Sequence, residues 1–343
     1  MKVLVARTDK LGDVVLSLPA IAWLKARRPA WELHALVAPR AAPLLEHDPG
    51  LARVWTWPED AGRLGAERFD AAVLLVYDRA VAAHLLRIGV RRRVGPLSRW
   101  TSWLLLSCGV RQRRSRGGWH ERDYNVGLVA ALAREEARGK LPAPRLALSG
   151  AQREAGRRFR AAAAPGAAVV AFVHAGSGGS ALGWPPERFG AVAARLAARD
   201  GWRLFLTGGE SDGEAVAAAA AAAGPAVTSL AGRYDLRELL GVLSGGDLMV
   251  APSTGPLHLA AALGLAAVGV MSPVPVQSAE RWGPLGPRAR SVAPDVLCPA
   301  RLACLGPRCR LWNCLETIGV DAVVAAALDA VAVAGEADGR SRG

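Results

Sequence analysis

Short apolar runs alternate with stretches of helical periodicity along most of this chain, a pattern typical of parallel sheets with helical crossovers. In the first half, the strands that this pattern predicts are residues 2–6, Leu33–Val37, Val54–Thr56 and Ala71–Val76. The helices predicted there are Val14–Arg27, Ala80–Leu86 and Val126–Arg138. Residues 91–124, which are basic and contain three tryptophans, interrupt the alternation, and we assign no element to most of them.

The alternation is more regular in the second half. Its predicted strands are Val169–Val173, Arg203–Thr207, Ala226–Leu230, Leu248–Ala251 and Ala267–Met271. The helices predicted between and after them are Pro186–Arg199, Asp212–Ala223, Leu236–Leu243, Pro256–Leu263 and Val320–Val333. Five strands with four crossovers of this length form a doubly wound parallel sheet.

Length and composition fit two such domains. A chain of 343 residues is long for one domain, and 51% hydrophobic residues can fill two cores. The Pro-, Arg- and Ala-rich stretch 142–166 has the composition of an interdomain connection. We therefore predict an α/β protein with Rossmann-like domains over 1–160 and 161–330 and a frayed tail over 331–343.

Charge separates the two halves. Residues 1–160 carry 29 Lys and Arg against 15 Asp and Glu, a net charge of +14, whereas residues 161–343 carry 14 against 15, a net charge of −1. The basic half predicts an anionic partner, and nucleic acid, an anionic lipid surface and a phosphorylated glycan all qualify. The alternative is that the arginines of 91–93 and 111–116 only keep loops solvated. No secretory signal and no apolar run of about 18 residues is visible, which predicts a cytoplasmic protein.

The turn after the strand at Leu248–Ala251 carries several groups suited to a ligand. Ser253 and Thr254 offer hydroxyls, Gly255 lets a ligand approach the backbone, and His258 follows one helical turn later. Backbone N–H groups at a helix start, together with the helix dipole, favour a phosphate there. The alternative is an ordinary helix cap, Ser253 or Thr254, with a chance histidine.

Two further strand ends carry polar loops. Residues 174–180, which include Ser177 and Gly178, expose backbone amides suited to a diphosphate, although a flexible loop without function has the same composition. The segment Thr207–Glu210 places Glu210 where dinucleotide folds hold ribose hydroxyls, and a solvent-facing glutamate is the alternative.

Asp13 is the acidic side chain best placed for chemistry. It follows the first predicted strand, beside Gly12, at a turn expected to face the cleft between the domains. A carboxylate there can act as a general base on an acceptor hydroxyl. The alternative is a helix N-cap, a position that aspartate strongly favours.

Four cysteines lie within 17 residues, at Cys298, Cys304, Cys309 and Cys314. In a cytoplasmic protein such clustering points to metal or redox chemistry, but zinc sites usually have tighter pairs. We predict that the four lie close together without forming a catalytic metal site. Cys108 stands alone in an apolar stretch and is predicted to be part of the core.

Taken together, these motifs resemble glycosyltransferase family 9, the ADP-heptose–lipopolysaccharide heptosyltransferases. The segments that carry the resemblance keep their order along the chain, and they are Leu4–Pro19 with Leu11-Gly12-Asp13, His120–Asn125, His174–Ser177 with Trp184-Pro185, Thr207–Glu210 and Ser253–Ala260. The cysteine-bearing segment also occurs in some members. Two positions depart from the family pattern, since Leu182 stands where many members have lysine and Ser253 where the best-studied type has aspartate.

The resemblance implies a GT-B architecture, with two Rossmann-like domains facing a central cleft, and inverting, metal-independent transfer of a heptose or another sugar. Asp13 matches the position of the base. The positions that match nucleotide-sugar contacts are Ser177, Gly178, Glu210, Ser253, Thr254, Gly255 and His258, and those on the acceptor side are Lys10, Gly12 and Arg122. The expected partners are a nucleotide-diphosphate sugar, such as ADP-heptose, and an anionic glycan or lipopolysaccharide-type glycolipid, with peripheral contact at the cytoplasmic face of the inner membrane. No cofactor and no nucleic acid are expected.

Two alternative functions stay open. A sugar-nucleotide epimerase has the same two-domain architecture, but it needs no basic acceptor half. A non-catalytic sugar-nucleotide-binding module is the other alternative. Leu182 is the best argument for that module, and the presence of both Asp13 and His258 is the argument against it.

Overall fold

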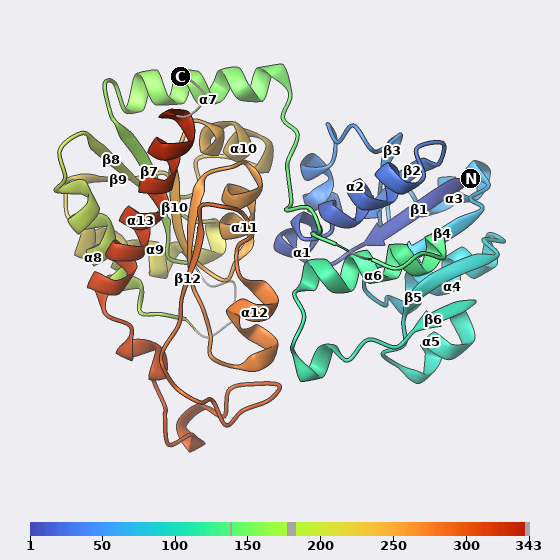
Figure 1. Cartoon of the computed structure of the whole chain (residues 1–343). Coiled ribbons are helices and arrows are strands. Elements are labelled where there is room, and N and C mark those ends of the chain that lie inside the picture. Colours follow the sequence, from blue (N-terminus) through green and yellow to red (C-terminus); the bar gives the residue numbers. More distant parts are fainter. Residues whose placement is uncertain (138, 177–182, 340–343) are drawn as a thin grey trace. The chain divides into compact units, whose positions relative to one another are not determined.

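The computed structural model contains two α/β units, each built on one six-stranded parallel sheet (Figure 1). It describes residues 1–137, 139–176 and 183–339. One unit comprises Met1–Arg114 and Trp119–Ala147, and the other comprises Ser115–Gly118 and Leu148–Gly343.

The first unit has the strand order β3-β2-β1-β4-β5-β6, with every neighbouring pair parallel. Its strands are β1 Lys2–Arg7, β2 Glu32–Val37, β3 Arg53–Thr56, β4 Ala71–Leu74, β5 Arg92–Pro96 and β6 Cys108–Val110. Its α-helices are α1 Leu11–Val15, α2 Leu18–Arg27, α3 Ala61–Leu64, α4 Arg79–Arg87, α5 Trp100–Leu105 and α6 Glu121–Ala133. The chain leaves β1 toward β2 on one side and later reaches β4 on the other, so the strand order reverses between β1 and β4.

The second unit has the strand order β12-β11-β10-β7-β8-β9, again parallel throughout. Its strands are β7 Val169–His174, β8 Trp202–Thr207, β9 Val227–Ser229, β10 Leu248–Pro252, β11 Ala266–Val270 and β12 Ala289–Val292. Its α-helices are α7 Gly150–Ala163, α8 Pro186–Ala197, α9 Gly213–Ala223, α10 Leu236–Ser244, α11 Gly255–Ala262, α12 Ala279–Trp282 and α13 Val320–Gly339. Here the strand order reverses between β7 and β10.

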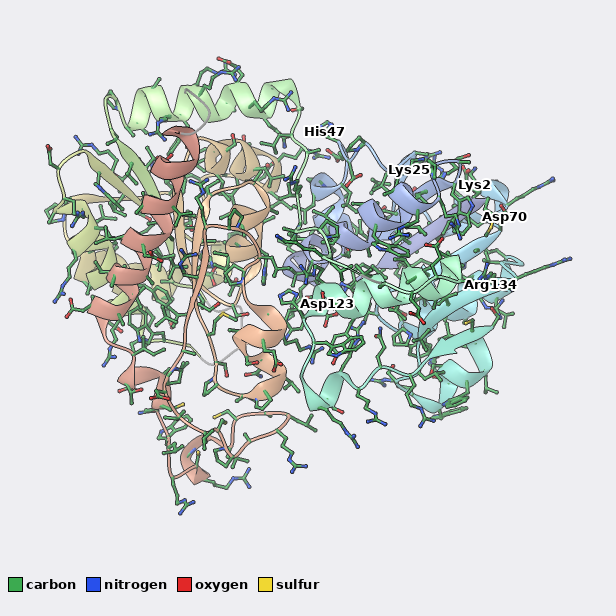
Figure 2. The ribbon with its side chains drawn as sticks, in the orientation of Figure 1. Lys2, Lys25, His47, Asp70, Asp123 and Arg134 are labelled. Atoms are coloured by element: carbon green, nitrogen blue, oxygen red, sulfur yellow. The ribbon has the colours of Figure 1, made fainter. Side chains whose placement is uncertain are left out.

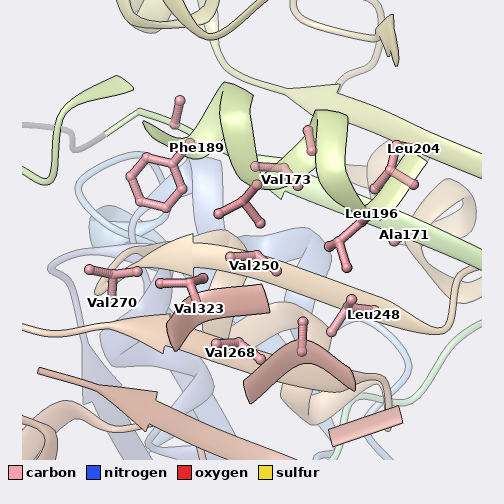
Figure 3. Close-up of a cluster of buried hydrophobic side chains, with 14 of the residues drawn as sticks. Ala171, Val173, Phe189, Leu196, Leu204, Leu248, Val250, Val268, Val270 and Val323 are labelled. Atoms are coloured by element: carbon pink, nitrogen blue, oxygen red, sulfur yellow. The ribbon is translucent and has the colours of Figure 1, made fainter. Parts of the chain in front are cut away.

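The core of the second unit shows why its strands are nearly continuous apolar runs. Val173, Val250 and Val268 come from three adjacent strands and pack with Phe189 of α8 and Val323 of α13 (Figure 3). A parallel sheet covered on its faces by helices buries both sides of each strand, so alternation of polar and apolar residues is lost. Burying each large side chain of this kind contributes about 1.5–3 kcal/mol.

Every strand predicted from the sequence is present, and the described chain contains three more, β5, β6 and β12. The prediction missed β5 because it begins with two arginines. The Arg93 side chain is nevertheless buried, since its Nε donates to the Leu105 carbonyl oxygen at 2.7 Å and Nη1 donates to that of Val90. Cys108 lies in the edge strand β6 and is exposed, so its predicted place in the core is wrong.

The predicted helix Val14–Arg27 is divided into α1 and α2. Pro19 stands in the first turn of α2, where its missing N–H costs nothing, but it cannot continue a helix that started earlier. The Ser17 hydroxyl donates to the Val14 carbonyl oxygen at 2.6 Å at this break.

The stretch 142–166 is only partly a connection, because it contains α7. Ser149 and Gln152 form a capping box at its start. Gly156 lies against α10, where an added Cβ would come within 2.6 Å of the Gly241 carbonyl oxygen. Because α7 packs on α10, the second unit begins at Leu148 and not at 161. The last helix likewise continues to Gly339, where the sequence predicted a frayed tail.

Candidate active site

In the first unit, polar groups gather where the strand order reverses, around the guanidinium of Arg7 at the end of β1. The Arg7 side chain is 3% exposed and contacts three carboxylates. Its Nε donates to Asp9 Oδ1 at 2.7 Å, Nη1 donates to Glu121 Oε1 at 3.0 Å, and Nη2 donates to Asp13 Oδ1. One buried cation therefore orients acidic side chains from the β1–α1 loop, from α1 and from α6.

Helix α6 completes this cluster with two residues one helical turn apart. Asn125 Oδ1 accepts from Arg7 Nη1 at 3.0 Å. The fully buried Glu121 also accepts from Arg114 Nη1 at 2.6 Å, and Arg114 Nη2 donates to the Leu75 carbonyl oxygen after β4 at 3.0 Å. Residues four apart lie on one face of a helix, so α6 presents Glu121 and Asn125 together. Buried charges of this kind persist because each is paired and hydrogen-bonded.

The environment of Asp13 changes its acidity. Burial raises its pKa to about 6, the nearby charge of Arg7 opposes that shift, and the charges of Asp9 and Glu121 add to it. Burial lowers the pKa of Arg7, but the three carboxylates outweigh burial and raise it, so Arg7 stays charged. A carboxylate with a pKa near 6 is mostly ionised at neutral pH and still accepts a proton more readily than an exposed aspartate, as a general base requires.

Asp13 does not cap a helix. Helix α1 begins at Leu11, its N-cap residue is Lys10, and Asp13 is the third residue of the helix. The Asp13 side chain is 15% exposed and is held by Arg7. The capping alternative from the sequence is therefore wrong, and the charge pair with Arg7 accounts for the position of the carboxylate. Gly12 is buried in the same helix, and Lys10 is exposed at its start.

Arg122, predicted to lie on the acceptor side, follows Glu121 in the first turn of α6. Its Nε donates at 2.6 Å to Oδ1 of Asp123, which is labelled in Figure 2, and Nη1 donates to the Leu141 carbonyl oxygen at 3.4 Å. The neighbouring side chain, Glu121, joins the Asp13 cluster through Arg7, and the acceptor role of Arg122 stays a prediction.

In the second unit, the loops after β10, β7 and β8 share one edge of the sheet, because these strands are adjacent and parallel. The register pairs Val250 with Val173 and His174 with Thr207. Ligands of doubly wound folds bind at this edge, where the strand order reverses. That position in this unit is the turn from β10 into α11.

At this turn, Thr254 is the N-cap residue of α11, but its side chain forms no capping hydrogen bond. Its hydroxyl donates to the Pro252 carbonyl oxygen at 3.2 Å instead of accepting from an amide of α11. Ser253, Thr254 and Gly255 are half-buried, and His258 is buried one turn later. A side-chain cap by Thr254 is therefore wrong, while the helix start retains the features of an anion site.

The loops after β7 and β8 meet through His174 and Asp212, neither of which was among the predicted site residues. His174 Nδ1 lies 3.1 Å from the Thr207 carbonyl oxygen, and Nε2 lies 3.9 Å from Asp212 Oδ2. Burial lowers the pKa of His174, with the Asp212 charge opposing it. The neutral imidazole with a proton on Nδ1 suits these contacts.

Glu210 opens the short 3₁₀ helix Glu210–Asp212 after β8 and is exposed. Asp212 Oδ2 accepts from the Gly209 N–H at 2.9 Å, which fixes the turn that presents Glu210. Ser177 and Gly178, and also Leu182, lie outside the described residues. The structure describes only the beginning of that loop. There Gly176 lies so close to Asp212 that an added Cβ would be 2.2 Å from the carboxyl carbon.

The four late cysteines line one cavity of about 200 Å³, so their predicted proximity is confirmed. Burial, and then the charges of the other three thiols, raise the pKa of Cys314. The segment is attached at its end, since the Ile318 carbonyl oxygen accepts from Trp184 Nε1 at 3.2 Å and from Arg188 Nη1 at 2.9 Å. Within the described residues, no group of three or more His, Cys, Asp or Glu side chains is arranged to hold a metal ion. Nor does any helix there have both the length and the hydropathy needed to cross a bilayer.

Known proteins resemble the chain in sequence and in fold. The model of glycosyltransferase family 9 (heptosyltransferase) matches residues 61–302. A Haemophilus influenzae protein classed as a candidate glycosyltransferase is 27% identical over 317 residues, which are 87% of this chain and 89% of that relative.

Solved structures share the fold at low identity. The ADP-heptose lps heptosyltransferase II of E. coli has a TM-score of 0.79 at 21% identity and covers 98% of this chain and 100% of its own. A family 9 glycosyl transferase of Veillonella parvula has a TM-score of 0.80 at 17% identity, over 96% and 97% of the two chains. The E. coli heptosyltransferase WaaC with ADP has a TM-score of 0.68 at 18% identity, over 97% and 100%. The two parallel-sheet units match the GT-B architecture of these enzymes, and the chain belongs to glycosyltransferase family 9.

Proposed function

We propose that this glycosyltransferase moves a sugar, with inversion and without a metal, from a nucleotide-diphosphate donor to an anionic cell-envelope glycan or a glycolipid of the lipopolysaccharide type. The observation that carries the proposal is the Asp13 carboxylate, oriented by the buried Arg7 and given a pKa of about 6. A binding module without catalysis has no need of a buried carboxylate tuned in this way.

The donor is assigned to the second unit. The amides at the start of α11 and the hydroxyls beside them meet the diphosphate charge, with His258 one turn away. Glu210 follows β8 and would hold ribose hydroxyls, as an acidic residue at such a strand end does in dinucleotide folds. The proposed donor residues are Ser177, Gly178, Glu210, Ser253, Thr254, Gly255 and His258. Structures of E. coli WaaC that share the fold contain ADP and ADP-2-deoxy-2-fluoro heptose, which makes ADP-heptose the first donor to test.

The acceptor is assigned to the first unit, with Lys10, Gly12 and Arg122 on its side. The acceptor hydroxyl attacks the anomeric carbon as the bond to the nucleotide diphosphate breaks, and Asp13 takes the hydroxyl proton. Arg7 keeps its charge while Asp13 takes the proton, because the carboxylates around it raise its pKa. The net charge of +14 over residues 1–160 attracts an anionic acceptor. As part of the same proposal, the enzyme works in the cytoplasm next to the inner membrane.

The direct test is sugar transfer by the purified full chain. ADP-heptose and a core-truncated lipopolysaccharide acceptor are incubated with the enzyme in the presence of EDTA, and product is followed by mass spectrometry. We expect transfer that needs the acceptor and survives EDTA. Conversion of the donor without any acceptor would favour the epimerase alternative, and donor binding without any conversion would favour the binding module.

A further inference from the structure

Helix α5 lies near β6, the edge strand of the first sheet (Figure 1). It carries large apolar side chains that are exposed. Trp100, Trp103 and Leu104 are 75%, 62% and 69% exposed. The opposite side of the helix is fixed, since Ser102 is fully buried and the Tyr77 hydroxyl donates to Thr101 Oγ1 at 2.8 Å. Single exposed apolar residues are common, but several that lie together on one helix indicate an interaction surface.

The chain around α5 is strongly basic. Residues 79–120 contain ten arginines and neither Asp nor Glu. Arg99 immediately precedes α5, and Arg111 follows β6 at the same end, because Leu97 donates its N–H to the Val110 carbonyl oxygen at 2.9 Å. Both arginines are exposed.

A third exposed arginine lies at the other end of α5. The buried Arg93 donates from Nε to the Leu105 carbonyl oxygen at 2.7 Å and from Nη1 to the Arg91 carbonyl oxygen at 3.3 Å. These two bonds bring Arg91, whose side chain is exposed, next to the last turn of α5. Cationic side chains therefore lie at both ends of the exposed apolar group.

We propose that this α5 surface, made of Trp100, Trp103, Leu104, Arg91, Arg99 and Arg111, docks the enzyme on an anionic phospholipid bilayer. Tryptophan prefers the headgroup layer, leucine the acyl boundary below it, and arginine the lipid phosphates. Charge complementarity favours a bilayer as the partner. Its anionic headgroups suit the arginines, and its apolar interior suits the tryptophans and the leucine. A second copy of the chain would set the same arginines against each other.

This surface would account for the location next to the inner membrane that the proposed function includes. Weak apolar insertion and attraction to anionic lipid each give only reversible binding, and together they give stable peripheral attachment. The first unit would then lie at the surface that holds a glycolipid acceptor. The docking surface itself does not depend on which sugar or nucleotide the enzyme uses.

The test is flotation of the full chain with vesicles of phosphatidylcholine alone or mixed with phosphatidylglycerol. The α5 variant Trp100→Ser/Trp103→Ser/Leu104→Ser is compared with a matched control, Trp312→Ser/Leu297→Ser/Leu302→Ser, which removes the same residue types, also exposed, from the second unit. We expect the wild type and the control to float with the anionic vesicles only, and the α5 variant to bind them about tenfold or more weakly. Equal flotation of the α5 variant and the wild type would overturn the proposal.

Two further measurements keep the test decisive. Arg91→Glu/Arg99→Glu/Arg111→Glu leaves the apolar side chains in place and should lose the preference for anionic vesicles, which answers the question even if the α5 variant fails to fold. Sedimentation velocity without vesicles reports self-association. A wild-type oligomer that the α5 variant abolishes would show that a second copy covers this surface, and the lipid proposal would then be wrong.

Discussion

Burial and the charge of Arg7 act in opposite directions on the acidity of Asp13 in the first unit. Without a partner, a buried aspartate would be protonated at neutral pH. Arg7 keeps Asp13 ionised, and Glu121 and Arg114 balance the remaining charge beneath it. The Asp13 pKa of about 6 results from these opposing effects, with burial the largest.

Asp13→Asn should separate catalysis from structure. Asparagine retains the size of the side chain and an oxygen for Arg7, but it cannot take a proton at this pH. We expect turnover to fall by about 10²–10⁴-fold, with ADP affinity unchanged. In the wild type, kcat/KM should decline as the pH falls through about 6, because Asp13 becomes protonated there. Near-normal turnover in this variant would exclude Asp13 as the base.

Glu121 should act on the pH profile through its charge. That charge raises the pKa of Asp13, so Glu121→Gln should lower this pKa and move the acid limb of the kcat/KM profile to lower pH. Glu135→Gln is a matched control just beyond α6, where it removes a carboxylate that pairs with Arg28. The control should leave the limb in place. An unmoved limb in Glu121→Gln, with the fold intact by circular dichroism, would show that the two carboxylates are not coupled.

At the scale of elements, two helices of the second unit begin in different ways. Helix α7 starts with the capping box of Ser149 and Gln152, whereas α11 starts at Thr254 without a side-chain cap. In an ordinary capped helix, a side chain of the helix itself accepts hydrogen bonds from the first-turn N–H groups. In the proposed function, the start of α11 meets the diphosphate of the donor instead.

Ser149→Ala should therefore affect mainly stability, and Thr254→Ala should affect mainly ADP binding. Loss of the α7 cap is expected to lower the free energy of unfolding by about 0.5–2 kcal/mol, measured by urea denaturation, without changing ADP affinity. Thr254→Ala is expected to cost less stability than Ser149→Ala and to weaken ADP binding in a calorimetric titration. If Thr254→Ala destabilised the protein as much as Ser149→Ala and bound ADP normally, α11 would be an ordinary capped helix.

The sequence predicted the strands that are continuous apolar runs and missed elements that contain arginine where an apolar residue is expected. The apolar runs of β7 and β10 were readable because both faces are covered. Strand β5 was missed because it contains Arg93, which is buried only because backbone carbonyl oxygens accept its hydrogen bonds. The local sequence does not show these contacts. Helix α7 was taken for part of a connection because its composition is arginine-rich and its contact with α10 depends on Gly156.

The candidate site shows the same limit. Asp13 could be selected from its place after a strand and beside a glycine. Its partners could not, because Glu121 lies 114 positions beyond Arg7 and meets it only through the fold. The signals that were present were an arginine at the very end of β1 and a glutamate and an asparagine four residues apart in α6.

At the scale of the whole molecule, two sheets of the same topology carry different chemistry where their strand order reverses. The first has a buried network of charges around Arg7, and the second has a helix start with hydroxyls and a buried histidine. The net charge follows the same division, basic in residues 1–160 and near neutral in 161–343. In the proposed function, one of these two equivalent positions serves the acceptor and the other serves the donor.

The assignment of the donor to the second unit predicts which backbone amides a bound nucleotide protects from hydrogen exchange. Hydrogen exchange of the full chain with and without ADP should show slowed amides within residues 166–290, above all in the first turn of α11 and in the loop after β8, because those amides and their neighbours would contact the diphosphate and ribose. At about 100 times its dissociation constant, ADP should also add roughly 2.7 kcal/mol to the free energy of unfolding. Inorganic phosphate at the same concentration serves as the control and should protect less, because it lacks the nucleoside. Protection confined to residues 1–147 would place the nucleotide in the first unit and overturn the assignment of donor and acceptor.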